Sequence, residues 1–373
     1  MSNRKMSKYL SRKIKFITVF PMIAVIFVNS YNFKDHFLQP TTRISEGFNA
    51  AAMFEYFFSN ELLRFAVPMF FAISGFLFFF TYENTAKCYV KKLKSRAKSI
   101  LIPYLIWTTL SGLTVTILSQ IPFFASLPII EEKAFGWTSF YMYLISPAAF
   151  QLWFLQQLMI FVLLAPILYF LIKKTRGIIL IALAIPWLMD YSFSIGIDGV
   201  FSFTIINFEG LFTFSVGAAF AIFSRSREFT RSENRIQTMI YIVIWILLSL
   251  LNTYIAAFAD DSFIFDIIML VLYKLNEAVG VIAMWYLFDH IAKRIYDKKG
   301  FIIAATHLFI VYAMHEPMLH IFFQMALRQG STLLGHVALY ICLPLSVGAV
   351  CIIVSMALRK NCRKFHGVLT GGR

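Results

Sequence analysis

The sequence predicts an all-α, polytopic membrane protein with about ten transmembrane helices and both termini in the cytoplasm. Hydrophobic residues make up 59% of the 373 residues and charged residues 14%, and the mean hydropathy of +0.73 exceeds what a soluble domain needs. The formal charge of +15 would suggest nucleic acid in a soluble chain, but the cations stand in short clusters between apolar runs. The charge therefore indicates membrane topology, and no nucleic-acid partner is expected.

The apolar runs are about 20 residues long, the length that crosses a hydrocarbon core at about 1.5 Å per helical residue. The first run follows a basic head, residues 1–15, and no small-residue cleavage site closes it, so we interpret it as an anchor helix. The last run precedes a basic tail, residues 359–373, which leaves residues 16–358 as a single transmembrane domain. The predicted helices cover about residues 16–33, 62–80, 99–121, 152–172, 177–194, 201–223, 236–258, 263–291, 301–325 and 334–358.

The turns between the runs justify these boundaries. Basic turns follow the second, fourth, sixth and eighth helices, with the sequences KCYVKKLKSRAK, KKTR, SRSREFTRSENR and AKRIYDKK. Turns with few cations stand between the others, including those with Glu131 and Glu132 and with Asp260 and Asp261, and the RQGST turn. Basic and non-basic turns thus alternate along the chain.

The distribution of the 34 Lys and Arg residues tests this layout, because cytoplasmic loops carry the excess of cations. With both termini inside, Lys34, Arg43, Lys133 and Arg328 fall in outer segments, and Arg64 and Lys274 fall within helices. All the other cations lie on the inner side. Cys342 and Cys351 lie in the last helix and Cys88 and Cys362 on the reducing side, so no structural disulfide is expected.

Polar residues inside apolar helices are the candidates for chemistry, because they are costly there and usually face a cavity or one another. Lys274 and Glu277, three residues apart on one helix face, are expected to form a structural ion pair. The basic cluster from Lys91 to Lys98 could hold an anionic cytoplasmic molecule or contact anionic lipid headgroups. The candidates expected in the outer half of the membrane are Asn29, Glu61, Arg64, Trp153, Glu209, His315 and Glu316.

The helix of residues 62–80 contains RFAVPMFFAISGFLFFF, in which Arg64, Pro68, Ser74 and Gly75 interrupt an apolar run. Arg64 could extend to the interface, and Ser74 and Gly75 could simply allow close helix packing. The alternative is that this helix does more than span the membrane, with Arg64 and Ser74 contacting a substrate.

Four separated segments together resemble the acyltransferase 3 family of integral-membrane acyltransferases. They are RFAVPMFFAISGFLFFF, RAKSILIPYLIW, LWFLQQLMIFVLLAPIL and IVYAMHEPML, beginning at residues 64, 96, 152 and 310. Each is a weak pattern alone, but their order and spacing match the family over nearly the whole chain.

The resemblance implies an O-acyltransferase that moves an acyl group, often acetyl from cytoplasmic acetyl-CoA, to a hydroxyl of a cell-envelope carbohydrate. It implies a multi-pass protein of the bacterial cytoplasmic membrane, in contact with membrane lipids and an envelope glycan, with no permanently bound cofactor and no metal. Acceptor, acyl chain and oligomeric state stay open. Expected substrate-binding residues are Arg64, Trp153, Ser74 and Glu209, and expected donor-binding residues are Lys92, Arg96, Lys98 and Tyr104, with Lys94 beside them.

His315 matches the family's histidine in a late helix and could take a proton from the acceptor hydroxyl. Glu316, about 100° away on a regular helix, is expected to be a poor orienter of His315. The first helix departs from the family, which usually carries a cation and, after ten intervening residues, a histidine; here Thr18 and Asn29 stand at those positions. Asn29 could donate a hydrogen bond to a carbonyl oxygen but cannot act as a base. The alternative function is therefore a non-catalytic relative that transports or exports a polysaccharide or small polar solute.

Overall fold

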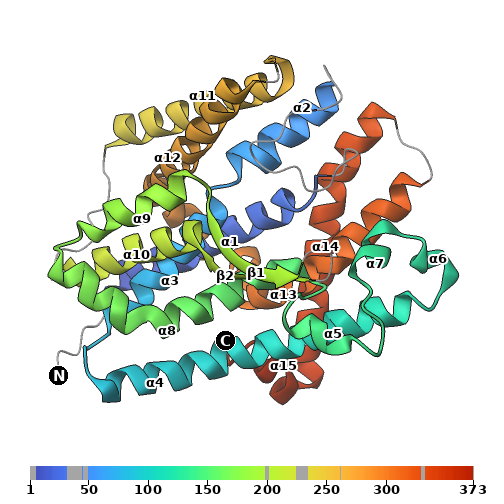
Figure 1. Ribbon diagram of the computed structural model, residues 1–373, viewed down its shortest axis with the longest axis horizontal. Helices are drawn as coiled ribbons and strands as arrows, with labels where there is room; N and C mark the ends of the chain where they lie inside the picture. The colour runs from blue at the N-terminus through green and yellow to red at the C-terminus, as the bar shows by residue number, and fades with distance from the viewer. Residues whose placement is uncertain are drawn as a thin grey trace.

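The computed structural model of the chain is almost entirely helical (Figure 1). In the residues that it describes, seven helices are long and apolar enough to cross a membrane, which supports the predicted multi-pass class. These helices cover Ala50–Phe80, Ala86–Leu118, Phe150–Lys174, Arg235–Phe258, Phe263–Ile291, Lys299–Leu327 and Leu333–Asn361. The described residues are 6–31, 44, 49–197, 201–223, 234–260, 262–328 and 332–372.

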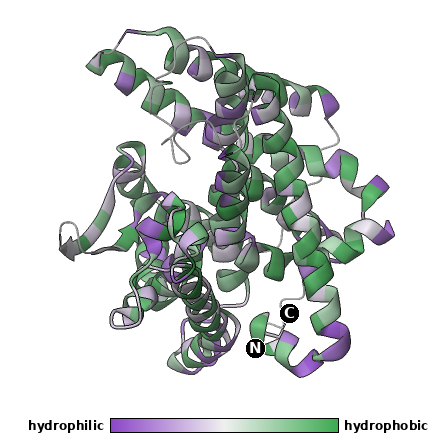
Figure 2. Ribbon diagram, turned by 90° about the vertical axis from the view of Figure 1, so that its right-hand side faces the viewer, coloured by the Kyte–Doolittle hydropathy of each residue, from purple (hydrophilic) through white to green (hydrophobic). Residues whose placement is uncertain are grey.

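Three other helices occupy the remaining predicted positions: α1 (Lys8–Val28), α9 (Ile179–Leu188) and α10 (Phe208–Phe223). Hydrophobic residues predominate along the long helices in Figure 2. The count of about ten spans and the cytoplasmic side of both termini stay predictions. Parts of the basic head and of the SRSREFTRSENR turn lie outside the described residues.

The helices begin where the sequence supplies caps. Ser7, Thr85, Asn234 and Thr332 each accept a backbone N–H of the first turn, at α1, α4 (Ala86–Arg96), α11 (Arg235–Phe258) and α14 (Leu333–Asn361). The other helices are α2 (Ala50–Tyr56), α3 (Ala66–Phe80), α5 (Ile102–Leu118), α6 (Pro122–Ala125), α7 (Pro128–Lys133), α8 (Trp153–Lys174), α12 (Phe263–Ile295), α13 (Lys299–Leu327) and α15 (Arg363–Leu369). Two π-helical segments, η1 (Phe57–Leu62) and η2 (Ala97–Leu101), and two 3-10 segments, η3 (Phe140–Leu144) and η4 (Phe150–Leu152), connect them.

A β-hairpin corrects the all-α prediction. Strand β1 (Ser192–Ile197) pairs antiparallel with β2 (Phe201–Asn207), where the sequence analysis placed the end of one helix and the start of the next. Both strands are rich in β-branched and aromatic residues, which favour extended backbone. Gln157 of α8 holds β2, because its amide nitrogen donates to the Thr204 carbonyl and its amide oxygen accepts the Asn207 N–H. The hairpin is thus attached to the helix that begins at Trp153.

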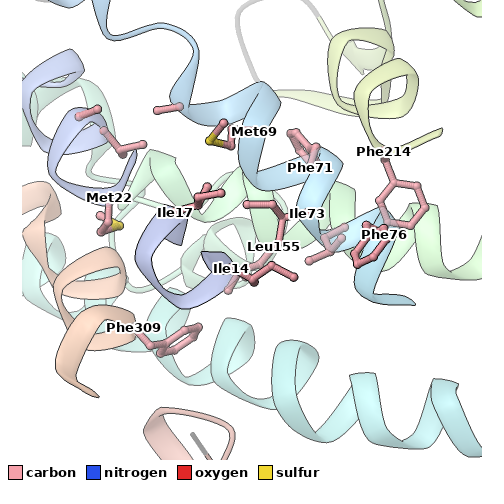
Figure 3. Packing of buried hydrophobic residues seen from close by; sticks show 14 of the residues in the cluster. Ile14, Ile17, Met22, Met69, Phe71, Ile73, Phe76, Leu155, Phe214 and Phe309 are labelled. Atoms are coloured by element: carbon pink, nitrogen blue, oxygen red, sulfur yellow. The ribbon is translucent and has the colours of Figure 1, made fainter. Parts of the chain in front are cut away.

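Helices α3 and α10 lie against each other at backbone contact (Figure 1). A Cβ at Gly75 would stand 2.0 Å from the Phe214 carbonyl oxygen, and one at Gly217 would stand 1.9 Å from that of Ala72. Small residues allow such close crossings in membranes. Phe71, Ile73 and Phe76 of α3 and Phe214 of α10 fill the core beside this contact (Figure 3).

The segment between α5 and α8 packs against α5 and α13. Tyr143 of η3 is buried against Gly112, and the Tyr104 hydroxyl donates to the Leu144 carbonyl at 2.8 Å. Near η4, the Gln151 amide nitrogen donates to the carbonyls of Tyr312 and Ala313, and the Tyr312 hydroxyl donates to the Gln151 carbonyl. These bonds fix the start of α8 beside the middle of α13.

Candidate functional site

A polar cavity of about 240 Å³ opens where the starts of α3, α8 and α10 meet the end of α1, the hairpin and α12. Arg64, Trp153 and Glu209, three of the four predicted substrate-binding residues, line it. Ser74 is not among its lining residues, because it stands about two helical turns beyond Val67, the lining residue on α3. The other lining residues are Val28, Leu63, Val67, Asp190, Ser192, Asn207, Tyr273 and Glu277.

Lys274 is not among the lining residues, but it pairs with three carboxylates that are. Its fully buried ammonium lies 2.6 Å from Asp190, 3.3 Å from Glu209 and 3.6 Å from Glu277. The predicted pairing with Glu277 is therefore the longest of three, and sequence reasoning missed Asp190. Asp190 adopts a positive φ of 51° directly before the hairpin, which no helical periodicity could reveal.

Arg64 follows the π-helical segment η1, a distortion frequent at functional sites. Its Nη2 donates to Asn60 Oδ1 at 2.7 Å, while its buried Nε has no hydrogen-bond partner among the described residues. Directly behind Arg64, Glu61 accepts hydrogen bonds from the amides of Asn252 and Asn276. These bonds hold η1 against α11 and α12, so the guanidinium is presented to the cavity by a rigid segment.

Asn29 and His315 are in direct contact beside this cavity. Asn29 Nδ2 lies 3.1 Å from His315 Nε2, and Val28, the residue before Asn29, lines the cavity. His315 Nδ1 lies 3.0 Å from the Val311 carbonyl oxygen and 2.9 Å from that of Tyr312, so Nδ1 carries a proton and donates it. Nε2 of the neutral ring therefore accepts from Asn29. The structure thus brings the two predicted catalytic residues together. The Asn29 amide, however, occupies the Nε2 lone pair that a general base would use.

Helix α13 breaks between His315 and Pro317. Glu316 has φ −109° and ψ 144°, because a residue before proline is disfavoured in the helical region and proline supplies no backbone N–H. The Glu316 carboxylate contacts His320, whose Nδ1 lies 2.7 Å from Oε2. Glu316 is thus the partner of His320 rather than of His315; the four-residue spacing, which sets two side chains on one helix face, is the sequence signal that could have found this pair.

The predicted donor-binding residues are not among the residues that line the cavity and lie on α4, η2 and α5. Lys98 is exposed and Arg96 is half-buried, while Lys92 donates to the Phe78 carbonyl at 2.7 Å and to the Thr81 hydroxyl at 2.8 Å. Lys92 therefore neutralises the end of α3. Tyr104 is buried and donates to Leu144, as described above, so its hydroxyl has a structural partner.

Thr18 and Lys13 show which position of α1 holds a buried cation. Thr18, at the position of the family's cation, donates its hydroxyl to the Lys15 carbonyl and is not among the residues that line the polar cavity. Lys13 instead is the buried cation of α1: its ammonium lies 2.7 Å from Asp289 and 4.0 Å from the Trp285 ring centroid. Among the described residues, no three His, Cys, Asp or Glu side chains gather as metal ligands.

Comparisons with known proteins bear on the family of the chain. A family model described as an acyltransferase domain, Acyl_transf_3, matches residues 14–360, which include all four segments that carry the resemblance. The succinoglycan biosynthesis protein ExoH of Rhizobium meliloti (strain 1021) is 34% identical to this chain over 131 residues. This alignment covers 34% of the chain and spans 35% of the length of ExoH. No solved structure matches the chain.

Proposed function

The chain belongs to the acyltransferase family whose domain it matches over residues 14–360, and from that premise we propose that it is an integral-membrane O-acyltransferase. It moves an acyl group, acetyl in the simplest case, from acyl-CoA to a hydroxyl of a cell-envelope polysaccharide. It works in the bacterial cytoplasmic membrane with both termini inside. Reporter fusions after Lys173 and Arg359 should then report inside, and fusions near Glu131 and Asp260 outside.

The polar cavity carries this proposal, because its lining suits a polyhydroxyl acceptor. The Trp153 ring supplies a flat apolar surface for a sugar face, and Arg64, Glu209 and Asn207 supply donors and acceptors for hydroxyls. The similarity to ExoH, a protein named for succinoglycan biosynthesis, supports a polysaccharide as the acceptor. We therefore assign Arg64, Trp153 and Glu209 to acceptor binding.

Asn29 and His315 act together in the proposed reaction. Asn29 has a second amide hydrogen besides the one donated to His315, and an amide N–H can stabilise the oxyanion that forms on the acyl carbonyl. His315 fixes the amide orientation, because its two carbonyl partners hold the tautomer that accepts from Asn29. The predicted catalytic pair thus becomes an oxyanion donor and the imidazole that orients it.

The donor is proposed to bind along α4 and η2, where Arg96 and Lys98 would meet the phosphates of coenzyme A. Arg96→Ala should then raise the Kd for acetyl-CoA, and more so at low salt, where screening is least. Lys298→Ala, which changes an exposed cation elsewhere, is the matched control. Equal affinity of both variants for coenzyme A would leave only contact with lipid headgroups for this cluster.

A transporter or exporter is the second candidate, because a buried lysine among three carboxylates beside a membrane cavity is also an arrangement found on ion and solute pathways. One experiment separates the two. Purified protein in proteoliposomes is given labelled acetyl-CoA and an envelope polysaccharide, and the label on the glycan is measured. Labelled glycan supports the transferase; no label, together with movement of the glycan across the bilayer, supports the transporter.

A further inference from the structure

We propose that His320, oriented by Glu316, is the general base of the acyl transfer. This inference rests on the proposed function and names the residue that removes the proton from the acceptor hydroxyl. It places the base on a histidine that the family resemblance did not single out.

His315 is already engaged in hydrogen bonds through both ring nitrogens. Its Nδ1 donates to two backbone carbonyls, and its Nε2 accepts from Asn29 at 3.1 Å. A general base needs an available lone pair within hydrogen-bond reach of the hydroxyl. His315 could act as a general base only after its hydrogen bond with the Asn29 amide breaks. In its present position Asn29 instead supplies a hydrogen-bond donor.

Glu316 orients the imidazole ring of His320. A carboxylate 2.7 Å from Nδ1 holds the imidazole in the tautomer with the proton on Nδ1, which makes Nε2 the proton acceptor. The same carboxylate stabilises the imidazolium that forms when Nε2 takes a proton. Glu316 is therefore a positioning residue and His320 is the catalytic residue.

Glu316 and His320 are both buried inside the membrane-spanning helix α13. Glu316 and His320 are 2% and 0% exposed, and ionisable pairs at such depth in a membrane protein are costly and usually functional. The ring of half-buried Phe150 stands 6.0 Å from the His320 ring, and Phe150 belongs to the turn that leads directly into Trp153 of the cavity. His320 thus packs against the turn that leads into the cavity wall, and the proposal requires the acceptor hydroxyl to reach Nε2 from this side.

The proposed step balances as follows. Nε2 of His320 takes the proton of the acceptor hydroxyl while the oxygen forms a C–O bond to the acyl carbon of the thioester. The carbonyl oxygen takes negative charge, which the Asn29 amide stabilises. The C–S bond then breaks, its electron pair stays on sulfur, and the imidazolium returns the proton to the thiolate. The products are the acylated glycan and free coenzyme A.

The test compares His320→Gln with His290→Gln in purified full-length protein. His290, whose Nε2 lies 3.1 Å from the Thr238 hydroxyl, belongs to neither the cavity nor the break. His320→Gln should lower kcat by about 10² to 10⁴-fold while the KM for the acceptor and the unfolding midpoint change little. Glu316→Gln should also lower kcat, Glu316→Asp should retain more of it, and added imidazole should restore part of the rate of His320→Gly.

Three results would overturn the assignment. Full-rate transfer by His320→Gln shows that the base is elsewhere. A loss that comes with a raised KM, a lowered unfolding midpoint and no response to imidazole shows that His320 supports the fold alone. Absence of transfer by the wild-type protein refutes the proposed function itself, and the base assignment with it, so the two failures are distinguishable.

Discussion

The side-chain amide of Asn29 donates a hydrogen bond to Nε2 of His315 at 3.1 Å, joining the end of α1 to the break in α13. The two residues stand 286 positions apart, and both are buried. Each determines what the other can do: the imidazole orients the amide, and the amide engages the basic nitrogen. The asparagine at the position of the family's first-helix histidine thus places a hydrogen-bond donor, and not a base, against His315.

Asn29→Ala should lower kcat by about 10² to 10³-fold, the cost of one oxyanion donor. It should also destabilise the protein by about 1–3 kcal/mol, because His315 Nε2 is left buried without its partner. Transfer rates and the free energy of unfolding in detergent micelles measure the two effects. An Asn29→Ala variant that transfers as fast as the wild-type protein would remove the amide from the proposed mechanism.

Lys274→Met should cost about 3–5 kcal/mol of the free energy of unfolding, because it leaves Asp190, Glu209 and Glu277 near one another without their shared cation. Denaturant titration in micelles measures this loss. Lys298→Met is the control, since Lys298 is exposed and the change there should be within about 0.5 kcal/mol. Equal losses in the two variants would mean that the three contacts of Lys274 carry no net stability.

Gly217→Ala should destabilise the α3–α10 contact by about 1–3 kcal/mol or more, because the new methyl would overlap the Ala72 carbonyl oxygen at 1.9 Å. Gly300→Ala is the matched control: a Cβ there meets nothing within 4 Å, and alanine favours the helix. Thermal unfolding midpoints of the two variants provide the comparison. Similar midpoints would contradict the close approach of the two backbones.

The docking of α15 should weaken as the pH falls. Ser355 Oγ lies 3.1 Å from His366 Nε2 and 2.7 Å from His307 Nδ1, and the Trp107 indole donates to the Leu369 carbonyl. Burial lowers the pKa of His366, and the positive charge of Arg359 acts in the same direction. The folded state thus binds fewer protons than the unfolded state, so this stability is present above about pH 6.5 and is lost as the pH falls through the lowered pKa.

Hydrogen exchange of the α15 amides measures this effect, after correction for the intrinsic pH dependence of exchange. Protection should fall between about pH 7.5 and pH 5.5 in the wild-type protein and change less in His366→Asn, which cannot be protonated in this range. His290→Asn should behave as the wild-type protein does. Constant wild-type protection across this range would contradict the prediction.

Much of the fold was predictable because a membrane-spanning helix can be recognised from the length and hydropathy of its own segment. A run such as Ile236 to Phe258 is long and apolar enough to span a bilayer whatever it packs against, and α11 covers Arg235–Phe258. The hairpin was not predictable from length and hydropathy, because two short apolar strands have the same length and hydropathy as the apolar ends of two helices. Its formation depends on Gln157 of a distant helix, which binds β2 through both amide atoms.

The candidate site was likewise predictable only in part. The sequence by itself determined the membrane class, the family and the polar residues that apolar helices hold at a cost, since Arg64, Trp153 and Glu209 were identified from residue type and place alone. Only the tertiary structure decided which of them meet: it joined Lys274 to Asp190, Asn29 to His315 and Glu316 to His320. The physical reason is that hydrogen bonds act over about 3 Å, whereas helix periodicity specifies only the direction of a side chain on its own helix.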